Sequence, residues 1–197
     1  AFGVEWLLAL GVDVVIPDFA SVMDTQGQLL PMALQLQKAL TWVTKQSTAM
    51  QCDASRIYVC GHSSGAHLAA SLCALDWQAT GLSKAPIAGL LCGSGLFDLE
   101  PVSLSSRSSY VTFDSVCLAQ LSPVRHLHAF DMPVRVLCGT QESPEFMRQS
   151  FEFHDLLLRH HARAELHWGE GLNHFEILET LETVDGFFGQ ALSALIR

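Results

Sequence analysis

Short apolar runs alternate with longer amphipathic stretches along most of the chain. The short runs are rich in β-branched residues or end at glycine or proline, and they predict about five strands, at residues 12–16, 56–60, 86–93, 133–139 and 164–168. The longer stretches repeat their apolar residues at helical spacing and predict helices at residues 31–50, 64–75, 144–160 and 175–196. This alternation predicts an α/β fold with a mostly parallel sheet and helices on both of its faces.

The remaining sequence contains no signal that would divide the chain. Residues 94–124 lose the regular pattern and are rich in serine, but no internal repeat, low-complexity tract or linker occurs. We therefore expect residues 1–197 to form a single domain.

Composition and charge exclude several classes of function. The 11 basic and 20 acidic residues give a net charge of −9, and no cluster of lysine and arginine occurs, so we expect no nucleic-acid partner. The apolar runs are short and interrupted, so we expect no membrane partner. None of the six cysteines forms a Cys-x-x-Cys pair and no signal peptide is evident, which favours buried free thiols and a cytoplasmic location.

The sequence Gly-His-Ser-Ser-Gly, residues 61–65, lies between a predicted strand and a predicted helix. A serine at the centre of such a turn projects its hydroxyl above the edge of the sheet, near the positive end of the following helix. Ser63 is therefore a candidate nucleophile, and the alternative is a purely structural strand-to-helix turn.

A nucleophilic serine needs a histidine base and a carboxylate that orients the base. Because functional groups in parallel sheets gather at the carboxyl ends of the strands, the loops after the later strands are the places to look. His174 follows the strand predicted at 164–168 and is the candidate base. Glu142, after the strand predicted at 133–139, is the candidate acid, and Asp98, after the strand predicted at 86–93, is its rival.

The other histidines and the cysteines show no spacing typical of metal ligands. We therefore expect neither a metal nor another cofactor. His62, beside the serine, is expected to be a packing or pocket residue, and Leu96, Phe97 and Tyr110 are candidates for the wall of a substrate pocket. For each of these last three residues the alternative is an ordinary core or surface position.

Several blocks of the sequence resemble one family. They read GHSSGAHLAA, SGLFDLEPV, LSPV, GTQESPEFMRQSFEF and NHFEILETL, and they span residues 61–181. They resemble kynurenine formamidase (arylformamidase) and its esterase relatives in the α/β-hydrolase superfamily. The resemblance implies hydrolysis of a formyl or short acyl group from a small-molecule aryl amide or ester, with Ser63 as nucleophile, His174 as base and the N–H of Ser64 in the oxyanion hole.

The chain departs from this family in two ways. The family has an aspartate where Glu142 stands, and it has an HGG-type loop, upstream of the residues matched here, that completes the oxyanion hole. No such loop occurs in residues 1–60. The resemblance also implies a strand before that loop, which would lie in the sheet between the strands matched by residues 12–16 and 56–60, and this strand is missing too. We therefore expect the sequence to be an N-terminally truncated piece of a longer enzyme.

These observations favour a serine hydrolase acting on an aryl formamide such as N-formylkynurenine through a Ser-His-Glu triad. A short-chain carboxylesterase would use the same triad, and a non-catalytic α/β-hydrolase-fold binding module is the alternative from another class. The sequence leaves open whether the chain forms a homodimer.

Overall fold

The computed structural model describes residues 3–197. Its four strands are β1 (Tyr58–His62), β2 (Gly89–Gly93), β3 (Val134–Gly139) and β4 (Ala164–Gly169). Its helices are α1 (Glu5–Ala9), α2 (Leu30–Gln46), α3 (Ser64–Ala74), α4 (Leu99–Ser103), α5 (Ser115–Gln120), α6 (Pro144–Arg159), α7 (Glu176–Glu179) and α8 (Phe187–Ile196). Short 3-10 helices occur at Ala54–Arg56, Gln78–Thr80, Ser106–Ser109, Pro123–Arg125 and Leu127–Ala129.

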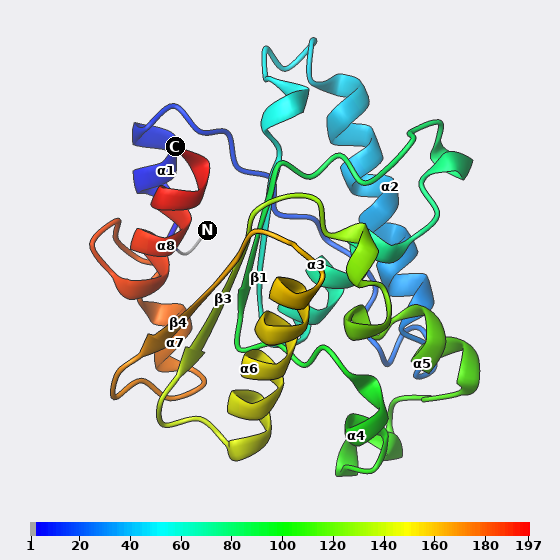
Figure 1. The fold of residues 1–197 in the computed structure, drawn as a ribbon. Coiled ribbons are helices and arrows are strands. Elements are labelled where there is room, and N and C mark those ends of the chain that lie inside the picture. Colours follow the sequence, from blue (N-terminus) through cyan, green and yellow to red (C-terminus); the bar gives the residue numbers. More distant parts are fainter. Residues whose placement is uncertain (1–2) are drawn as a thin grey trace.

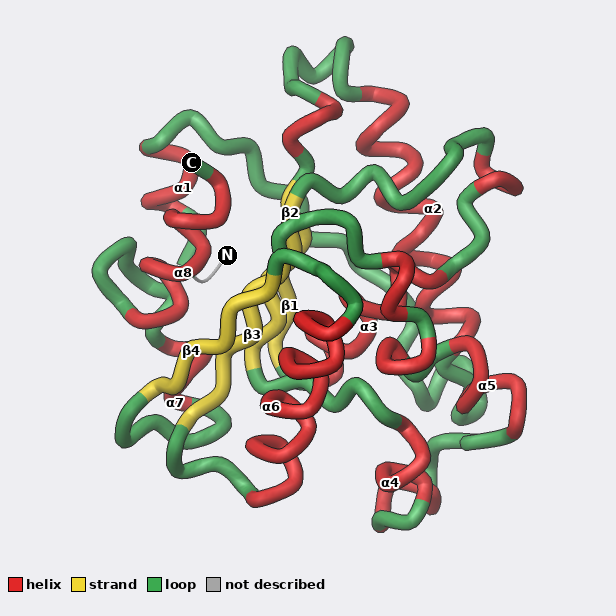
Figure 2. The backbone as a smooth tube through the Cα atoms, viewed as in Figure 1, coloured by secondary structure: helices red, strands yellow, loops and turns green. Residues whose placement is uncertain are grey.

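The strands form one parallel sheet in the order β1-β2-β3-β4 (Figures 1 and 2). Each strand is linked to the next by a segment that crosses one face of the sheet, as parallel pairing requires. Because all four strands run the same way, the residues that follow them meet at a single edge of the sheet. The predicted parallel α/β architecture is confirmed.

Helices cover both faces of the sheet. Helices α3 and α6 pack on one face, where Leu90 and Cys92 of β2 join their core, and α8 packs on the other face with Leu91. This alternation follows from the two-residue repeat of a strand, which sends successive side chains to opposite faces. In Figure 1, α1 and α8 lie together on one side of the strands, and α6 and α3 lie on the other.

The strand predicted at residues 12–16 is wrong. This segment has no regular secondary structure, and Figure 2 draws it as loop. Val12 and Val14 pack against the core on the α8 face, whereas Val15 and Ile16 are 47% and 62% exposed. A run of β-branched residues becomes a strand only when a neighbouring strand accepts its backbone hydrogen bonds. In the described residues, β1 pairs with β2 alone and forms an edge of the sheet.

The edge position of β1 also changes the environment of one cysteine. All six cysteines are free thiols, and Cys73, Cys92, Cys117 and Cys138 are buried as expected. Cys60, however, is exposed, although its apolar neighbours predicted burial. It lies on β1, which has a neighbouring strand on one side only, while every residue of β2 is buried.

The helix predicted at residues 175–196 is interrupted. It consists of α7 and α8, and residues 180–186 form a turn between them. In this turn the Thr180 hydroxyl donates to the carbonyl of Ile177 and accepts the N–H of Phe188, which closes α7 and starts α8. The apolar positions of both helices still face one core, so their periodicity predicted their shared face but not the break.

Candidate active site

Ser63 occupies a strained turn between β1 and α3. It is the N-cap of α3, with φ 56° and ψ −121°. A residue other than glycine rarely adopts such a backbone, and it persists only where the surrounding structure enforces it. Gly61 makes the turn possible, because a Cβ atom at this position would lie 2.3 Å from the carbonyl oxygen of Gly65. The local sequence thus places the Ser63 hydroxyl at the carboxyl end of β1.

Three side chains from separate loops form a continuous hydrogen-bonded chain at this edge of the sheet. The His174 Nε2 atom lies 2.9 Å from the Oγ atom of Ser63, and its Nδ1 atom lies 2.7 Å from Oε2 of Glu142. A carboxylate can only accept hydrogen bonds, so Nδ1 carries the proton and Nε2 is free to accept the Ser63 hydroxyl. The arrangement is that of a nucleophile, a base and an orienting acid.

Glu142 is fully enclosed at the inner end of this chain. Its side chain has no exposed surface, while the side chain of His174 is 21% exposed. The Oε1 atom accepts two further hydrogen bonds, from the Ser94 hydroxyl at 2.5 Å and from the backbone N–H of Gly139 at 2.9 Å. Burial on its own raises the pKa of Glu142, but the hydrogen bonds from His174, Ser94 and Gly139 outweigh it and hold the pKa below the ordinary value of 4.5. Glu142 is therefore a carboxylate at neutral pH.

The rival acid, Asp98, has a different role. It is the N-cap of α4, where its carboxylate accepts the backbone N–H of Glu100 at 3.0 Å. The side chain of Gln149 ties the backbone around Asp98 to α6, because it accepts the N–H of Asp98 and donates to its carbonyl. Of the two carboxylates considered from the sequence, Glu142 is the one hydrogen-bonded to His174.

Backbone and aromatic groups surround the serine and the imidazole. Ser64 is the first residue of α3, and N–H groups in the first turn of a helix have no acceptor within the helix. They can therefore bind an anion that develops beside Ser63. The rings of Phe146 and Phe175 flank the His174 imidazole, with centroids 4.3 Å and 5.5 Å away, and Phe175 is 74% exposed.

Comparison with known proteins shows similarities of sequence and fold. A family model described as an alpha/beta hydrolase fold matches residues 30–122. Kynurenine formamidase from Salmo salar is 30% identical over 171 residues, which is 82% of this chain and 54% of the relative. Kynurenine formamidase from Danio rerio is 28% identical over 161 residues, which is 79% of this chain and 53% of the relative.

The chain is an α/β-hydrolase-fold protein similar to kynurenine formamidases. It spans about half the length of the curated relatives it matches. Solved structures agree on the α/β-hydrolase fold. A carboxylesterase from Lactobacillus plantarum has a TM-score of 0.70 at 19% identity, covering 88% of this chain and 65% of the esterase. An esterase from Pyrobaculum calidifontis has a TM-score of 0.68 at 15% identity, covering 86% and 60% respectively.

His62 lies beside His174. Its ring centroid lies 4.8 Å from that of His174, and its Nε2–H donates to the His174 carbonyl oxygen at 2.8 Å. Burial lowers the pKa of His62 below its ordinary value of 6.5, and the nearby His174 lowers this pKa further. A neutral His62 therefore fixes the backbone of the loop that carries the base.

The three candidates for the pocket wall occupy different environments. Phe97 is a core residue, because its ring is fully buried and stacks on Phe153 with centroids 4.1 Å apart. Leu96 is partly buried against the core formed by α2, α4 and α5. Tyr110 is 47% exposed at the end of a 3-10 helix, and its N–H makes a local hydrogen bond to the Arg107 carbonyl. The placement of Phe97 corrects the expectation that it lines a pocket.

Other polar groups have structural roles. His67 is buried and hydrogen-bonded to the Leu121 carbonyl at 2.7 Å, and Glu145, in the first turn of α6, pairs with Arg148. Within residues 3–197, no three His, Cys, Asp or Glu side chains are grouped so that they could hold a metal ion. No helix in this range is long and apolar enough to cross a bilayer.

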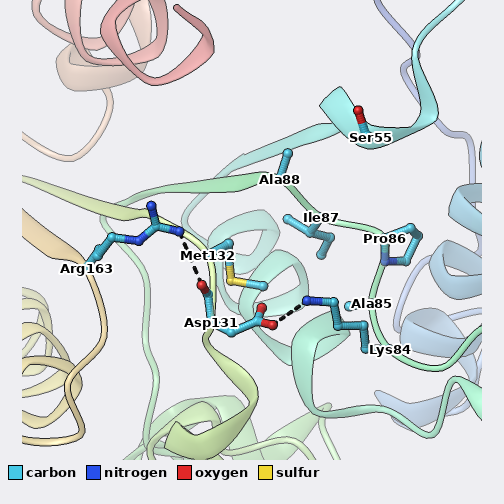
Figure 3. Close-up of a pocket in the computed structure, with 9 residues that line it drawn as sticks. All are labelled: Ser55, Lys84, Ala85, Pro86, Ile87, Ala88, Asp131, Met132 and Arg163. Atoms are coloured by element: carbon cyan, nitrogen blue, oxygen red, sulfur yellow. Dashed lines mark hydrogen bonds and ion pairs between the residues drawn. The ribbon is translucent and has the colours of Figure 1, made fainter.

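A hollow of about 310 Å³ lies at the opposite end of the sheet (Figure 3). Its lining includes Ser55, Lys84–Ala88, Asp131 and Arg163, which precede the four strands and therefore lie at their amino ends. Lys84 pairs with the Asp131 carboxylate and Arg163 donates to the Asp131 carbonyl, as the dashed lines show. Lys84 is thus ion-paired and Arg163 is hydrogen-bonded to the backbone, and the hollow is remote from Ser63.

Proposed function

We propose that this chain carries the catalytic residues of a serine hydrolase that works by acyl transfer. The observation that supports this most strongly is the uninterrupted contact from Ser63 through His174 to Glu142, at 2.9 Å and 2.7 Å. Structural requirements alone do not call for a strained serine, a histidine and a buried carboxylate in line. Together they meet the requirements of an activated nucleophile.

In the proposed mechanism, the Ser63 oxygen attacks the carbonyl carbon of the substrate as His174 Nε2 takes its proton. Negative charge moves to the carbonyl oxygen, where the Ser64 N–H at the start of α3 stabilises it. The Nδ1–H of the imidazolium stays hydrogen-bonded to the Glu142 carboxylate, which holds the tautomer and offsets the positive charge. His174 then gives its proton to the leaving amine or alkoxide, which leaves an acyl group on Ser63. Water attacks this acyl group as His174 takes a proton from it, and His174 returns the proton to the Ser63 oxygen as the acid is released.

The substrate that the relatives favour is an aryl formamide, with N-formylkynurenine as the specific candidate. Support comes from the kynurenine formamidases that are 28% and 30% identical. The test compares hydrolysis of N-formylkynurenine and p-nitrophenyl acetate by the wild-type protein and by Ser63→Ala. A higher kcat/KM for the formamide, abolished in Ser63→Ala, is expected. Turnover that survives in Ser63→Ala would remove Ser63 from the mechanism.

A short-chain carboxylesterase is the second candidate. It is favoured by the fold shared with the esterases from Lactobacillus plantarum and Pyrobaculum calidifontis. The same triad would serve both reactions, since an ester and an amide pass through similar tetrahedral intermediates. A kcat/KM for p-nitrophenyl acetate far above that for the formamide would favour the esterase.

A non-catalytic binding module is the candidate from another class. The observation that bears on it is that residues 1–60 contain no HGG-type loop, so this segment does not supply a second oxyanion donor of that kind. Loss of one such donor lowers kcat by about 10²–10³ in a known hydrolase. A cooperatively folded protein with no measurable turnover of either substrate would favour this module.

A further inference from the structure

We infer that Ser94 is a positioning residue, whose hydroxyl holds the Glu142 carboxylate in line with His174. This inference rests on the proposed function of the site, and it adds a fourth side chain to the three considered so far. Ser94 follows β2 directly, just as Ser63 follows β1, and β2 lies between β1 and β3 in the sheet. The loop after β2 therefore lies between the loops that carry Ser63 and Glu142.

The contacts of Ser94 are specific and fully buried. Its relative exposure is 0%, its N–H donates to the Leu137 carbonyl at 2.7 Å, and its hydroxyl donates to Oε1 of Glu142 at 2.5 Å. The backbone bond fixes Ser94 against β3, so the hydroxyl approaches the carboxylate from a rigid element.

Glu142 needs such a support because its side chain is long. A glutamate has one more rotatable bond than an aspartate, so its carboxyl group can be displaced more easily. Here Oε1 is held by the Ser94 hydroxyl and the Gly139 N–H, which leaves Oε2 for the His174 imidazole. Only one of these two supports comes from a side chain, and it can be removed by substitution.

The backbone at Ser94 argues that the hydroxyl itself is required. Its φ is +53°, a left-handed conformation that is unfavourable for a residue with a side chain and that glycine adopts freely. A glycine would therefore make the same turn with less strain. Serine at this position is explained by its contact with Glu142.

The charge of Glu142 also depends on the titratable groups that lie around it. His174 donates to it, and His62 is close enough to interact electrostatically. The Cys138 thiol is neutral at pH 7, because burial and the nearby charge of Glu142 raise its pKa to about 12. Removing the Ser94 hydroxyl should consequently raise the pKa of Glu142, since the carboxylate loses a donor while remaining buried.

The test compares Ser94→Ala and Ser94→Gly with the wild-type protein. Ser71→Ala is the matched control, because Ser71 is also fully buried and its hydroxyl donates to the His67 carbonyl rather than to the triad. A carboxyl-carbon NMR titration of Glu142 reports the positioning contact without requiring activity. Hydrolysis of p-nitrophenyl acetate reports its effect on the reaction.

We expect the titration midpoint of Glu142 to move to higher pH in both Ser94 variants and to stay unchanged in Ser71→Ala. We expect kcat to fall roughly 10- to 100-fold with little change in KM, the size of a lost hydrogen bond to a charged group. Ser94→Cys, which keeps a weaker donor, should lie between these variants and the wild type. Glycine is compatible with the positive φ at this position, so Ser94→Gly still tests the inference if Ser94→Ala fails to fold.

An unchanged Glu142 midpoint in both Ser94 variants would overturn the inference, whether or not the protein hydrolyses any substrate. A shifted midpoint in a protein that hydrolyses nothing would support the contact and count against the proposed function. Equal loss of kcat in Ser71→Ala would show a general effect of buried serines and would also overturn the inference.

Discussion

Replacing Ser63 by glycine should increase the stability of the protein relative to Ser63→Ala. Both substitutions delete the hydroxyl, but alanine retains a Cβ atom at φ 56° and ψ −121°, whereas glycine does not. The strain at such a position is about 1–3 kcal/mol. Glycine in turn lowers the unfolding free energy by about 0.4–1 kcal/mol relative to alanine, because it makes the unfolded chain more flexible. The expected difference in unfolding free energy is thus about 1 kcal/mol in favour of glycine, a Tm difference of about 2–4 °C in a chain of this size.

Urea unfolding and thermal scans of both variants measure this difference. A higher urea midpoint for Ser63→Gly, with the same m value, would show that this variant is the more stable one and that both expose the same surface on unfolding. Neither variant should hydrolyse p-nitrophenyl acetate. A Ser63→Gly protein that is equal to or less stable than Ser63→Ala would refute the backbone strain inferred at Ser63.

Three further perturbations test the site. Gly61→Ala should lower the unfolding free energy by about 1–3 kcal/mol, because the new Cβ would lie 2.3 Å from the Gly65 carbonyl oxygen. Gly65→Ala is the control, because its Cβ would meet nothing within 4 Å, and urea unfolding should show it to be nearly neutral. Wild type should be more stable than Glu142→Gln, and this difference in unfolding free energy should be largest above the ordinary glutamate pKa of 4.5. The difference should disappear as pH falls through the lower pKa of Glu142 in the folded state, as urea midpoints at several pH values would show. His62→Leu, which cannot donate to the His174 carbonyl, should lower kcat about fivefold and leave KM unchanged, and an unchanged kcat would contradict the role of His62.

Elements with strong local signals were predictable from the sequence. The apolar runs that contain β2 and β3 and the proline-started stretch that forms α6 carry their own periodicity and boundaries. The failure at residues 12–16 has a different origin. A strand requires a partner, and the run of valines and isoleucine cannot indicate whether one lies beside it. Likewise, the break after α7 depends on the Thr180 side chain, which the apolar repeat does not report.

The candidate site was predictable where one rule applied, namely that side chains following parallel strands meet at one edge. This rule pointed to His174 and to Glu142 with Asp98 as its rival, while the Gly-x-Ser-x-Gly turn pointed to Ser63. The side chains of Ser63, His174 and Glu142 lie in turn within hydrogen-bonding distance. The same rule also covers Ser94, which follows β2 directly, but its neighbours offered no motif that set it apart. Phe97 was a candidate for the pocket wall but lies in the core, where it stacks on Phe153. The direction of a ring in a loop is decided by tertiary packing, which the sequence does not show.

Fluorophosphonate labelling followed by peptide mass spectrometry tests whether Ser63 is a nucleophile activated by His174, because the reagent forms a stable adduct only with an activated serine. This role predicts one adduct per chain, on Ser63, and none in Ser63→Ala. It also predicts much slower labelling in His174→Ala, since the base that takes the hydroxyl proton is gone. An adduct on another serine, no adduct on a folded protein, or labelling of His174→Ala at the wild-type rate would contradict it.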